Sequence, residues 1–153
     1  MRFYIATGVG NAALAIRLAN TLMNHGHELT YDWTAHGDVR YSGEQRMSEV
    51  AFNEFRAVRD AELVIGLLPG GNGTHTELGA AIATRSNKRI ILWSETGEEF
   101  SHDDRTCVFY YHPAVERIVC PLEVLLELFD FDVINPEIND YRVYCGQSCL
   151  RTN

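Results

Sequence analysis

The stretch ELVIGLLPGGNGTHTELGAA, Glu62–Ala81, joins an apolar run to a glycine-rich loop and then to an alanine-rich segment. The run Glu62–Leu68 lacks alternation with polar residues, which is typical of a parallel strand covered on both faces. Thr74–Thr84 predicts a helix that the polar pair Ser86-Asn87 brings to an end. The stretch therefore predicts a strand, a loop and a helix in succession.

The same alternation of strand and helix extends along the chain. Further apolar runs predict four more strands, the last of them weaker: Phe3–Ala6, Arg89–Trp93, Thr106–Tyr110 and Glu28–Trp33. Apolar residues at helical spacing, or a proline suited to the first helical position, predict three more helices: Ala15–Leu22, Met47–Val58 and Pro121–Phe129. This order predicts an α/β fold, a single flavodoxin-like (Rossmann-like) domain with a parallel five-stranded sheet in the order 2-1-3-4-5.

The chain is long enough, at 153 residues, for one well-buried domain. We assign residues 1–131 to this domain and residues 132–153 to a C-terminal tail of unknown role. The tail holds Pro136, Tyr141 and Tyr144 without a clear period. A strap across a neighbouring subunit is one role that its composition allows.

Composition excludes several classes of protein. Hydrophobic residues make up 46% and charged residues 22% of the chain, which excludes a disordered, collagen-like or coiled-coil protein. The net charge of −8 repels polyanions, so we expect neither a nucleic acid polymer nor an anionic membrane as partner. No apolar run approaches the roughly 20 residues of a membrane span, and the N-terminus has no signal-like apolar core, so we expect a cytoplasmic protein.

Metal and cofactor signatures are lacking in the sequence. The four cysteines form no CxxC pair, and we expect reduced thiols. The six histidines form no HExxH motif and no zinc spacing with cysteine, so we expect no metal. Neither glycine loop contains the Gly-Lys-Ser/Thr of a P-loop, which disfavours NTP hydrolysis.

Two glycine loops are expected to meet at one edge of the sheet, because ligands of doubly wound sheets bind where the winding reverses, here between the first and third strands. Their candidate ligand-binding residues are Gly8, Gly10 and Asn11 in the first loop and Gly70, Gly71, Gly73, Thr74 and His75 in the second. Glycine lets backbone amides approach a sugar or phosphate, and each loop enters the positive end of a helix. A tight turn without ligand is the alternative for the first loop, and a solvated loop histidine is the alternative for His75.

Thr74 and Glu77 have two interpretations. Thr74-x-x-Glu77 has the spacing of a capping box, with Thr74 as the N-cap and Glu77 reaching back. A cap does not explain three glycines in the four positions before it, which cost backbone entropy unless something approaches closely. We therefore expect Glu77 to remain ionised at the helix N-terminus and to act as a nucleophile on a sugar carbon. Cleavage of a C–N glycosidic bond would then pass through a glycosyl-enzyme.

Three blocks resemble the nucleoside 2-deoxyribosyltransferase family, which includes deoxynucleoside 5′-monophosphate N-glycosidases. The blocks are Phe3-Tyr4-Ile5-Ala6-Thr7-Gly8, Ala61-Glu62-Leu63-Val64-Ile65 and the more specific Gly73-Thr74-His75-Thr76-Glu77-Leu78-Gly79-Ala80-Ala81. The resemblance covers roughly Arg2–Trp93. It implies that residues 1–131 form a nucleoside 2-deoxyribosyltransferase-like domain. It implies that Glu77 matches the family's nucleophile and that Tyr4 matches the tyrosine that positions this nucleophile and the sugar. It also implies a homo-oligomer.

The chain departs from that family at two positions. The family keeps an aspartate on the helix before the third strand, and counting eight residues back from Glu62 reaches Glu54. Glu54 either supplies the same carboxylate on a longer arm or is an exposed helix residue, and Asn53 is a weaker candidate. Six residues before the nucleophile the family often places Asp or Ser against the ligand, whereas this chain has Gly71.

A second resemblance involves the same loop. Pro69-Gly70-Gly71-Asn72-Gly73-Thr74-x-x-Glu77 is similar to the PGGxGTxxE signature of LOG-type phosphoribohydrolases, which release cytokinin bases from nucleotides. Both resemblances imply cleavage or transfer of the N-glycosidic bond of a nucleoside or nucleoside 5′-monophosphate, without a cofactor. A non-catalytic nucleotide sensor, in which Glu77 is only a cap, is the alternative from another class.

Three other features have open interpretations. Asp32 and Trp33 end the weak second strand at the same edge of the sheet, where the carboxylate would bind sugar hydroxyls and the indole would stack on a base, with a plain strand end as the alternative. Arg17 lies two turns into the first helix, and we expect it on the surface. The polar connection from Glu95 to Arg105 is either a lid or a solvated loop.

Overall fold

The structure is a computed structural model that describes residues 1–104, 106–130, 142–145 and 148–150. The strands are β1 (Arg2–Ala6), β2 (Glu28–Leu29), β3 (Leu63–Leu67), β4 (Arg89–Ser94), β5 (Val115–Val119), β6 (Arg142–Cys145) and β7 (Ser148–Leu150). The α-helices are α1 (Ala12–Asn24), α2 (Glu44–Asp60), α3 (Asn72–Ala83) and α4 (Leu122–Asp130). Short 3₁₀ turns are η1 (Val9–Asn11), η2 (Trp33–Ala35), η3 (Glu98–Phe100) and η4 (Val108–Tyr111).

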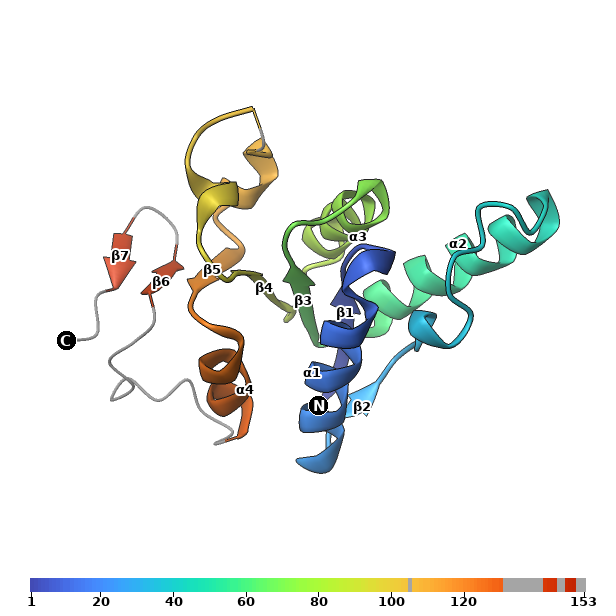
Figure 1. Cartoon of the computed structure of the whole chain (residues 1–153), viewed down its shortest axis with the longest axis horizontal. Coiled ribbons are helices and arrows are strands. Elements are labelled where there is room, and N and C mark those ends of the chain that lie inside the picture. Colours follow the sequence, from blue (N-terminus) through green and yellow to red (C-terminus); the bar gives the residue numbers. More distant parts are fainter. Residues whose placement is uncertain (105, 131–141, 146–147, 151–153) are drawn as a thin grey trace.

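The sheet confirms the predicted fold class and strand order. Strands β2, β1, β3, β4 and β5 are parallel neighbours in that order, and α1 packs against α4 while α2 packs against α3 (Figure 1). The C-terminal tail adds two antiparallel strands, because β6 pairs with β5 and β7 pairs with β6. The remainder of the tail, including Pro136 and Tyr141, lies outside the described residues.

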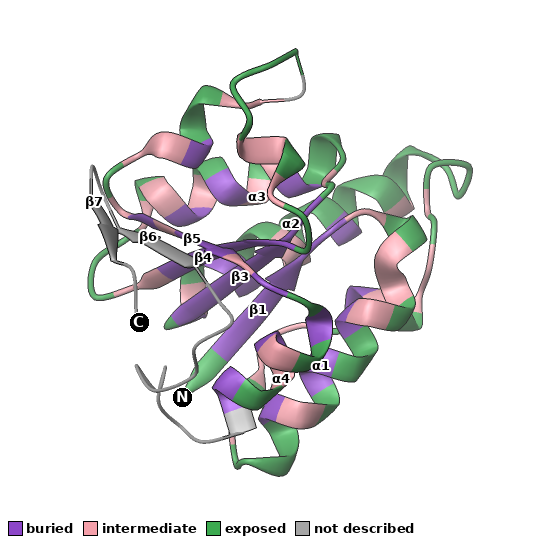
Figure 2. Ribbon diagram, turned by 60° about the vertical axis from the view of Figure 1, so that its left-hand side comes forward, coloured by how far each residue is buried: buried purple, intermediate pink, exposed green. Residues whose placement is uncertain are grey.

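The core lies on both faces of the central strands, which are buried along most of their length (Figure 2). All of β3 is buried, which explains its continuous apolar sequence. In α1 the buried positions are Ala15, Leu18, Ala19 and Leu22, the helical spacing noted in the sequence. Arg17 is exposed, as predicted, and pairs with Glu123 of α4 at 3.5 Å.

The predicted strand at Thr106–Tyr110 is wrong. This segment leads into the 3₁₀ turn η4, and the fifth parallel strand is β5, which carries two adjacent charged residues between apolar ones. The charges of β5 are compensated in the fold: Glu116 accepts two hydrogen bonds from Arg89 of β4, at 2.8 and 2.7 Å. The Arg117 guanidinium lies 4.1 Å from the ring centre of Tyr111. These partners outside the strand allow a charged sequence to form an inner strand.

The weak second strand is shorter than predicted. It ends at Leu29, and Trp33 belongs to the turn η2. The indole N–H of Trp33 donates to the carbonyl of Ile5 at 2.9 Å, which holds the chain close to β1 without extending the ladder. The fourth helix begins at Leu122 rather than at Pro121, whose carbonyl accepts from the amide of Leu125. None of the helices in the described ranges is long and apolar enough to cross a bilayer.

The C-terminus of α2 is capped by a lysine from the loop before β4. The ammonium group of Lys88 donates to the carbonyls of Val58 at 2.8 Å, Arg59 at 3.2 Å and Ala61. A cation at this position satisfies carbonyls that have no partner within the helix and interacts favourably with the helix dipole. Lys88 therefore holds the C-terminus of α2 next to the first residue of β4.

We expect Lys88→Met to lower the free energy of unfolding by about 1–2 kcal/mol, because it removes charge-assisted hydrogen bonds from partly buried carbonyls. Urea denaturation at pH 7 measures this change. Arg85→Met is the control: its exposed side chain makes one hydrogen bond to the carbonyl of Ile82 at 3.3 Å, so its loss should cost less than about 0.5 kcal/mol. Equal losses in the two variants would contradict the capping role of Lys88.

Candidate functional site

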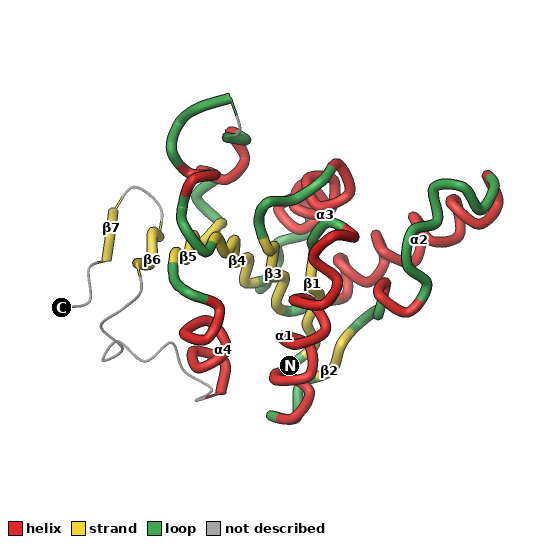
Figure 3. Tube along the Cα trace, in the orientation of Figure 1, coloured by secondary structure: helices red, strands yellow, loops and turns green. Residues whose placement is uncertain are grey.

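A cleft of about 520 Å³ opens at the carboxyl ends of β1 and β3, where the winding of the sheet reverses. The loops that follow these two strands meet there, since a Cβ built on Gly8 would lie 3.8 Å from the amide nitrogen of Gly71 (Figure 3). The opposite wall is formed by α2 and by the loop between η2 and α2. The volume of the cleft lies in the range of small-molecule sites.

The floor of the cleft holds a hydrogen bond between β1 and α3. The hydroxyl of Tyr4 donates to Oε1 of Glu77 at 2.5 Å. Tyr4 is fully buried in β1, and Glu77 is partly exposed because it lines the cleft. The two side chains are 73 residues apart in sequence, so the sheet and the helix packed on it bring them together.

Burial governs the protonation of both groups. Removal from water raises the pKa of Glu77 to about 7, the hydrogen bond from Tyr4 lowers it, and the charge of Glu54 raises it again. Burial, followed by the charge of Glu77, raises the pKa of Tyr4 above its ordinary value, so the phenol remains a donor. The expectation that the N-terminus of α3 keeps Glu77 ionised is wrong in its cause, since Glu77 lies beyond the first turn of α3 and burial raises its pKa.

Glu54 lies in the cleft with Glu77. It is partly buried on α2, and burial raises its pKa while nearby His36 lowers it. Of the two interpretations of Glu54, the structure favours a carboxylate directed to the cleft over an exposed helix residue. Two carboxyl groups in one cleft favour a state in which one of them carries a proton.

The capping box is not formed by Thr74 and Glu77. Helix α3 begins at Asn72, with Gly71 as N-cap, so Thr74 is its third residue. The Thr74 hydroxyl accepts from the amide of Gly71 at 3.2 Å, and the Glu77 side chain bonds to Tyr4 instead of the helix N-terminus. The threonine therefore stabilises the first turn, and Glu77 has no capping role.

The glycines of the second loop serve different purposes. A Cβ on Gly70 would lie 2.8 Å from Cβ of Thr74, so Gly70 is required by packing within the chain. A Cβ on Gly71 or Gly73 would meet no atom within 4 Å, and both residues line the cleft, as do Gly8 and Gly10. These four glycines leave room beside the backbone for a ligand.

Two residues predicted to bind ligand are already engaged by the protein. Asn11 donates to Oγ1 of Thr7 at 3.1 Å and to the carbonyl of Pro69 at 3.2 Å, which ties the two glycine loops together. Both ring nitrogens of His75 have partners, the carbonyl of Gly71 and the hydroxyl of Tyr110. Neither Asn11 nor His75 lines the cleft, so the structure does not bring them into the site.

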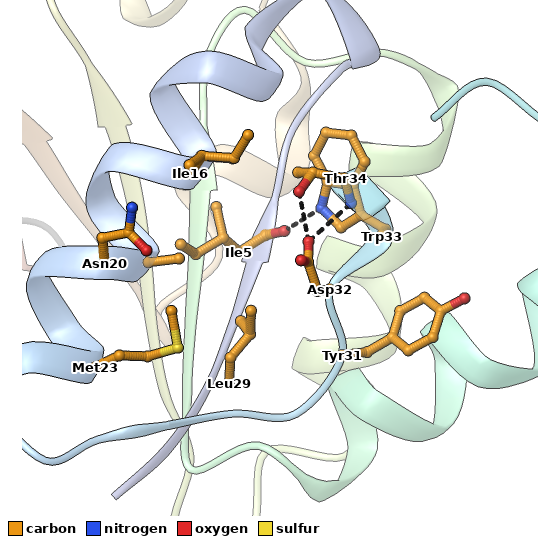
Figure 4. Close-up of a pocket in the computed structure, with 11 residues that line it drawn as sticks. Ile5, Ile16, Asn20, Met23, Leu29, Tyr31, Asp32, Trp33 and Thr34 are labelled. Atoms are coloured by element: carbon orange, nitrogen blue, oxygen red, sulfur yellow. Dashed lines mark hydrogen bonds between the residues drawn. The ribbon is translucent and has the colours of Figure 1, made fainter. Parts of the chain in front are cut away.

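Asp32 lies at a separate recess of about 50 Å³ between α1 and the turn η2 (Figure 4). Its carboxylate accepts from the amide of Thr34 at 3.0 Å and from the Thr34 hydroxyl at 2.5 Å, so it caps η2. The recess is on the face of β1 that carries Ile5, opposite to Glu77, and its volume suits a few water molecules at most. The structure therefore separates Asp32 from the cleft.

The loop between η2 and α2 supplies cleft residues that the sequence did not indicate. They are His36, Gly37, Asp38, Val39 and Arg40. Arg40 is the one Lys or Arg among the described residues of the cleft lining, and its guanidinium is held by Asp38 through three hydrogen bonds of 2.9, 2.9 and 2.5 Å. This loop lacks apolar periodicity, and glycine and charge alone do not distinguish a cleft wall from a solvated loop.

The cleft is lined by two carboxyl groups and glycine backbone, and the Tyr4 phenol donates to one of these carboxyls, an arrangement suited to nucleophilic or acid–base chemistry on an oxygen-rich ligand. Within the described residues no group of three His, Cys, Asp or Glu side chains is placed to hold a metal ion.

Comparison with known proteins identifies a structural relative. No protein-family profile matches the chain, and no curated protein sequence matches it. Among solved structures, the Clostridium botulinum CMP N-glycosidase BcmB is similar, with 20% sequence identity and a TM-score of 0.59 over 87% of this chain and 100% of that one. At this identity the likeness shows a shared fold.

We expect Glu77→Gln to stabilise the protein in a pH-dependent manner. The folded-state pKa of Glu77, about 7, lies above the ordinary value of 4.5, so stability falls as pH rises through this window. An uncharged amide avoids that loss. The free energy of unfolding of Glu77→Gln should exceed that of the wild type by on the order of 2 kcal/mol at pH 8, and the two should be equal at pH 4.5. Urea unfolding at the two pH values, with the exposed Glu49→Gln as control, measures it; a gain independent of pH would contradict this assignment.

Proposed function

We propose that this protein cleaves the N-glycosidic bond of a nucleoside or nucleoside 5′-monophosphate, with Glu77 as the nucleophile. The observation that carries the proposal is the Tyr4–Glu77 hydrogen bond at the floor of a cleft bordered by glycine loops. A carboxylate that accepts a hydrogen bond on one oxygen has the other oxygen available for attack. The resemblance of the sequence to nucleoside 2-deoxyribosyltransferases gives both residues the same roles.

The structural neighbour supports the same class of reaction. BcmB is named as a CMP N-glycosidase, and the two chains share a fold over the whole of that protein. One fold hosts many functions, so the proposal needs the residues of the site in addition to the structural likeness to BcmB. The paired carboxyl groups and the tyrosine supply that site.

The first step requires Glu77 as carboxylate and Glu54 as acid. Oε2 of Glu77 forms a bond to C1′ of the sugar while the C1′–N bond breaks, and the bonding electron pair leaves with the base. Glu54 gives its proton to the departing base, which leaves as a neutral molecule. The hydrogen bond from the Tyr4 hydroxyl to Oε1 favours the carboxylate form of Glu77 that the attack requires, and burial raises the pKa of Glu54, which favours the protonated form of the acid.

The second step releases the sugar. Glu54, now ionised, takes a proton from a water molecule whose oxygen bonds to C1′, and the C1′–Oε2 bond breaks to regenerate Glu77. A second base in place of water gives a new nucleoside, so the same site serves as hydrolase or transferase. The ratio of hydrolysis to transfer depends on whether water or a second base reaches the glycosyl-enzyme.

The cleft lining offers two kinds of contact to the substrate. The backbone of Gly8, Gly10 and Gly71 beside the N-terminus of α3 suits sugar hydroxyls or a phosphate. The side chains of Val39, Met47 and Val50 suit the faces of a base. Glu77 lines the same cleft, so C1′ of the bound sugar is proposed to lie beside its carboxyl.

Two other candidates use the same cleft. A LOG-type phosphoribohydrolase would require a ribonucleotide and yield ribose 5-phosphate, and a nucleotide sensor would bind without turnover. We also propose a homo-oligomer, on the basis of the family resemblance and the exposed side chains of Phe52 and Phe55 on α2. Light scattering coupled to size exclusion tests the assembly.

Incubation with ribo- and deoxyribonucleosides and their 5′-monophosphates should release free base from at least one of them. Glu77→Gln should lower the rate at least 10³-fold, because it removes the nucleophile, while Glu49→Gln should retain the rate. Chromatography detects the base, and addition of a second base distinguishes transfer from hydrolysis. Binding without release in the wild type would support the sensor and reject the enzyme.

Tyr4→Phe should shift the pH profile of base release. The hydrogen bond from Tyr4 lowers the pKa of Glu77, so its loss moves the acidic limb of kcat/KM, expected near pH 7, to higher pH. Tyr111→Phe, which removes a hydroxyl bonded to the carbonyl of Phe100 and outside the cleft lining, is the control. Superimposable profiles of Tyr4→Phe and the wild type would exclude Tyr4 as the group that tunes Glu77.

A further inference from the structure

His75 connects α3 to the turn η4, which lies 35 residues further along the chain. Its Nδ1 lies 2.7 Å from the carbonyl oxygen of Gly71, and its Nε2 lies 2.8 Å from the hydroxyl of Tyr110. The two rings are stacked, with centroids 5.7 Å apart and planes inclined by 17°. Both ring nitrogens are therefore occupied by the protein itself.

The partners determine where the protons lie. A carbonyl oxygen only accepts, so Nδ1 of His75 carries a hydrogen and donates it to Gly71. In the tautomer with its hydrogen on Nδ1, the ring accepts at Nε2 from the Tyr110 hydroxyl. Burial raises the pKa of Tyr110 to about 12, so the phenol keeps its proton at physiological pH.

Tyr110 is itself firmly held. It is 2% exposed, and its ring packs edge-on against Phe100 of η3 at 5.9 Å. The next residue, Tyr111, donates its hydroxyl to the carbonyl of Phe100 at 2.7 Å and packs against Arg117 of β5. The turn η4 is thus fixed to the sheet independently of α3.

The other end of this connection is the wall of the cleft. Gly71 lines the cleft as N-cap of α3, and its carbonyl accepts from both the amide and Nδ1 of His75, at 3.2 and 2.7 Å. Glu77 follows two residues after His75 on the same helix. An exposed helix N-terminus would otherwise fray, and any tilt of the first turns would move the Glu77 carboxyl relative to Tyr4.

We propose that His75 and Tyr110 are positioning residues, which hold the first turns of α3 so that Glu77 and the Gly71 backbone keep the geometry needed for cleavage of the glycosidic bond. This inference rests on the proposed function. Neither side chain lines the cleft, so neither contacts the reacting atoms. Their effect is exerted through the orientation of α3.

Tyr110→Phe removes only the hydroxyl and should lower kcat for base release about tenfold, with KM changed less than about twofold, because misplacement of a reacting group by a fraction of an ångström slows the reaction. Tyr111→Phe is the matched control, since it removes a neighbouring hydroxyl of the same turn that does not bond to α3. Its kcat should equal that of the wild type. Wild-type kcat in Tyr110→Phe, or equal losses in both variants, would overturn the proposal.

A double-mutant cycle tests the connection directly. His75→Phe keeps a stacked ring but loses both hydrogen bonds, and it should also lower kcat about tenfold. If the two residues act as a unit, His75→Phe combined with Tyr110→Phe should be no slower than His75→Phe alone. If the double variant loses kcat by the product of the two single losses, His75 and Tyr110 act separately, and the proposal is overturned.

Hydrogen exchange gives a readout that does not depend on activity. Amides of residues 72–78 should exchange about tenfold faster in Tyr110→Phe than in the wild type, and at the wild-type rate in Tyr111→Phe. Unchanged amide exchange in Tyr110→Phe would show that Tyr110 does not hold α3 and would overturn the proposal, even if the enzyme is active. If the wild type releases no base from any substrate, the proposed function fails, and the exchange experiment still decides whether His75 and Tyr110 hold the helix.

Discussion

The site depends on one hydrogen bond, from the Tyr4 hydroxyl to the Glu77 carboxyl. Tyr4 belongs to β1, which pairs with strands on both sides and carries a fully buried side chain at this position. Glu77 belongs to α3, which packs on the sheet. The bond therefore orients the Glu77 carboxyl with respect to the most constrained part of the fold, and a side chain held in this way would lose little conformational freedom on binding a ligand.

The same arrangement is electrostatically unfavourable in the absence of substrate. Glu54 and Glu77 share the cleft, and the one guanidinium of its described lining, that of Arg40, is already bound by Asp38. Burial raises the pKa of both glutamates, so the charged forms of both are costly in this cleft. A site that tolerates such a cost is typical of acid–base and nucleophilic chemistry, because the pKa values are moved toward the pH at which the protein operates.

Most of the fold followed from local sequence. Strands β1, β3 and β4 and helix α1 were predicted because burial on both faces, or on one helical stripe, leaves a pattern within a few residues. Strand β5 was missed because its two charges have partners outside the strand: Glu116 pairs with Arg89, 27 residues away, and Arg117 packs on Tyr111 of the turn η4. The cap that Lys88 provides for α2 was missed for the same reason.

The sequence alone determined the glycine loops and their position after the first and third strands, because these signals lie within single strand–loop–helix units. Its resemblance to a known family singled out Tyr4 and Glu77 as candidates. Only the tertiary structure decided which of the candidates lie together. It placed Glu54 in the cleft, Asp32 on the opposite face of β1, and His75 against Tyr110 instead of a ligand. The physical reason is that local periodicity specifies which residues are buried, whereas the direction and partner of a polar side chain depend on elements that meet only when the sheet is assembled.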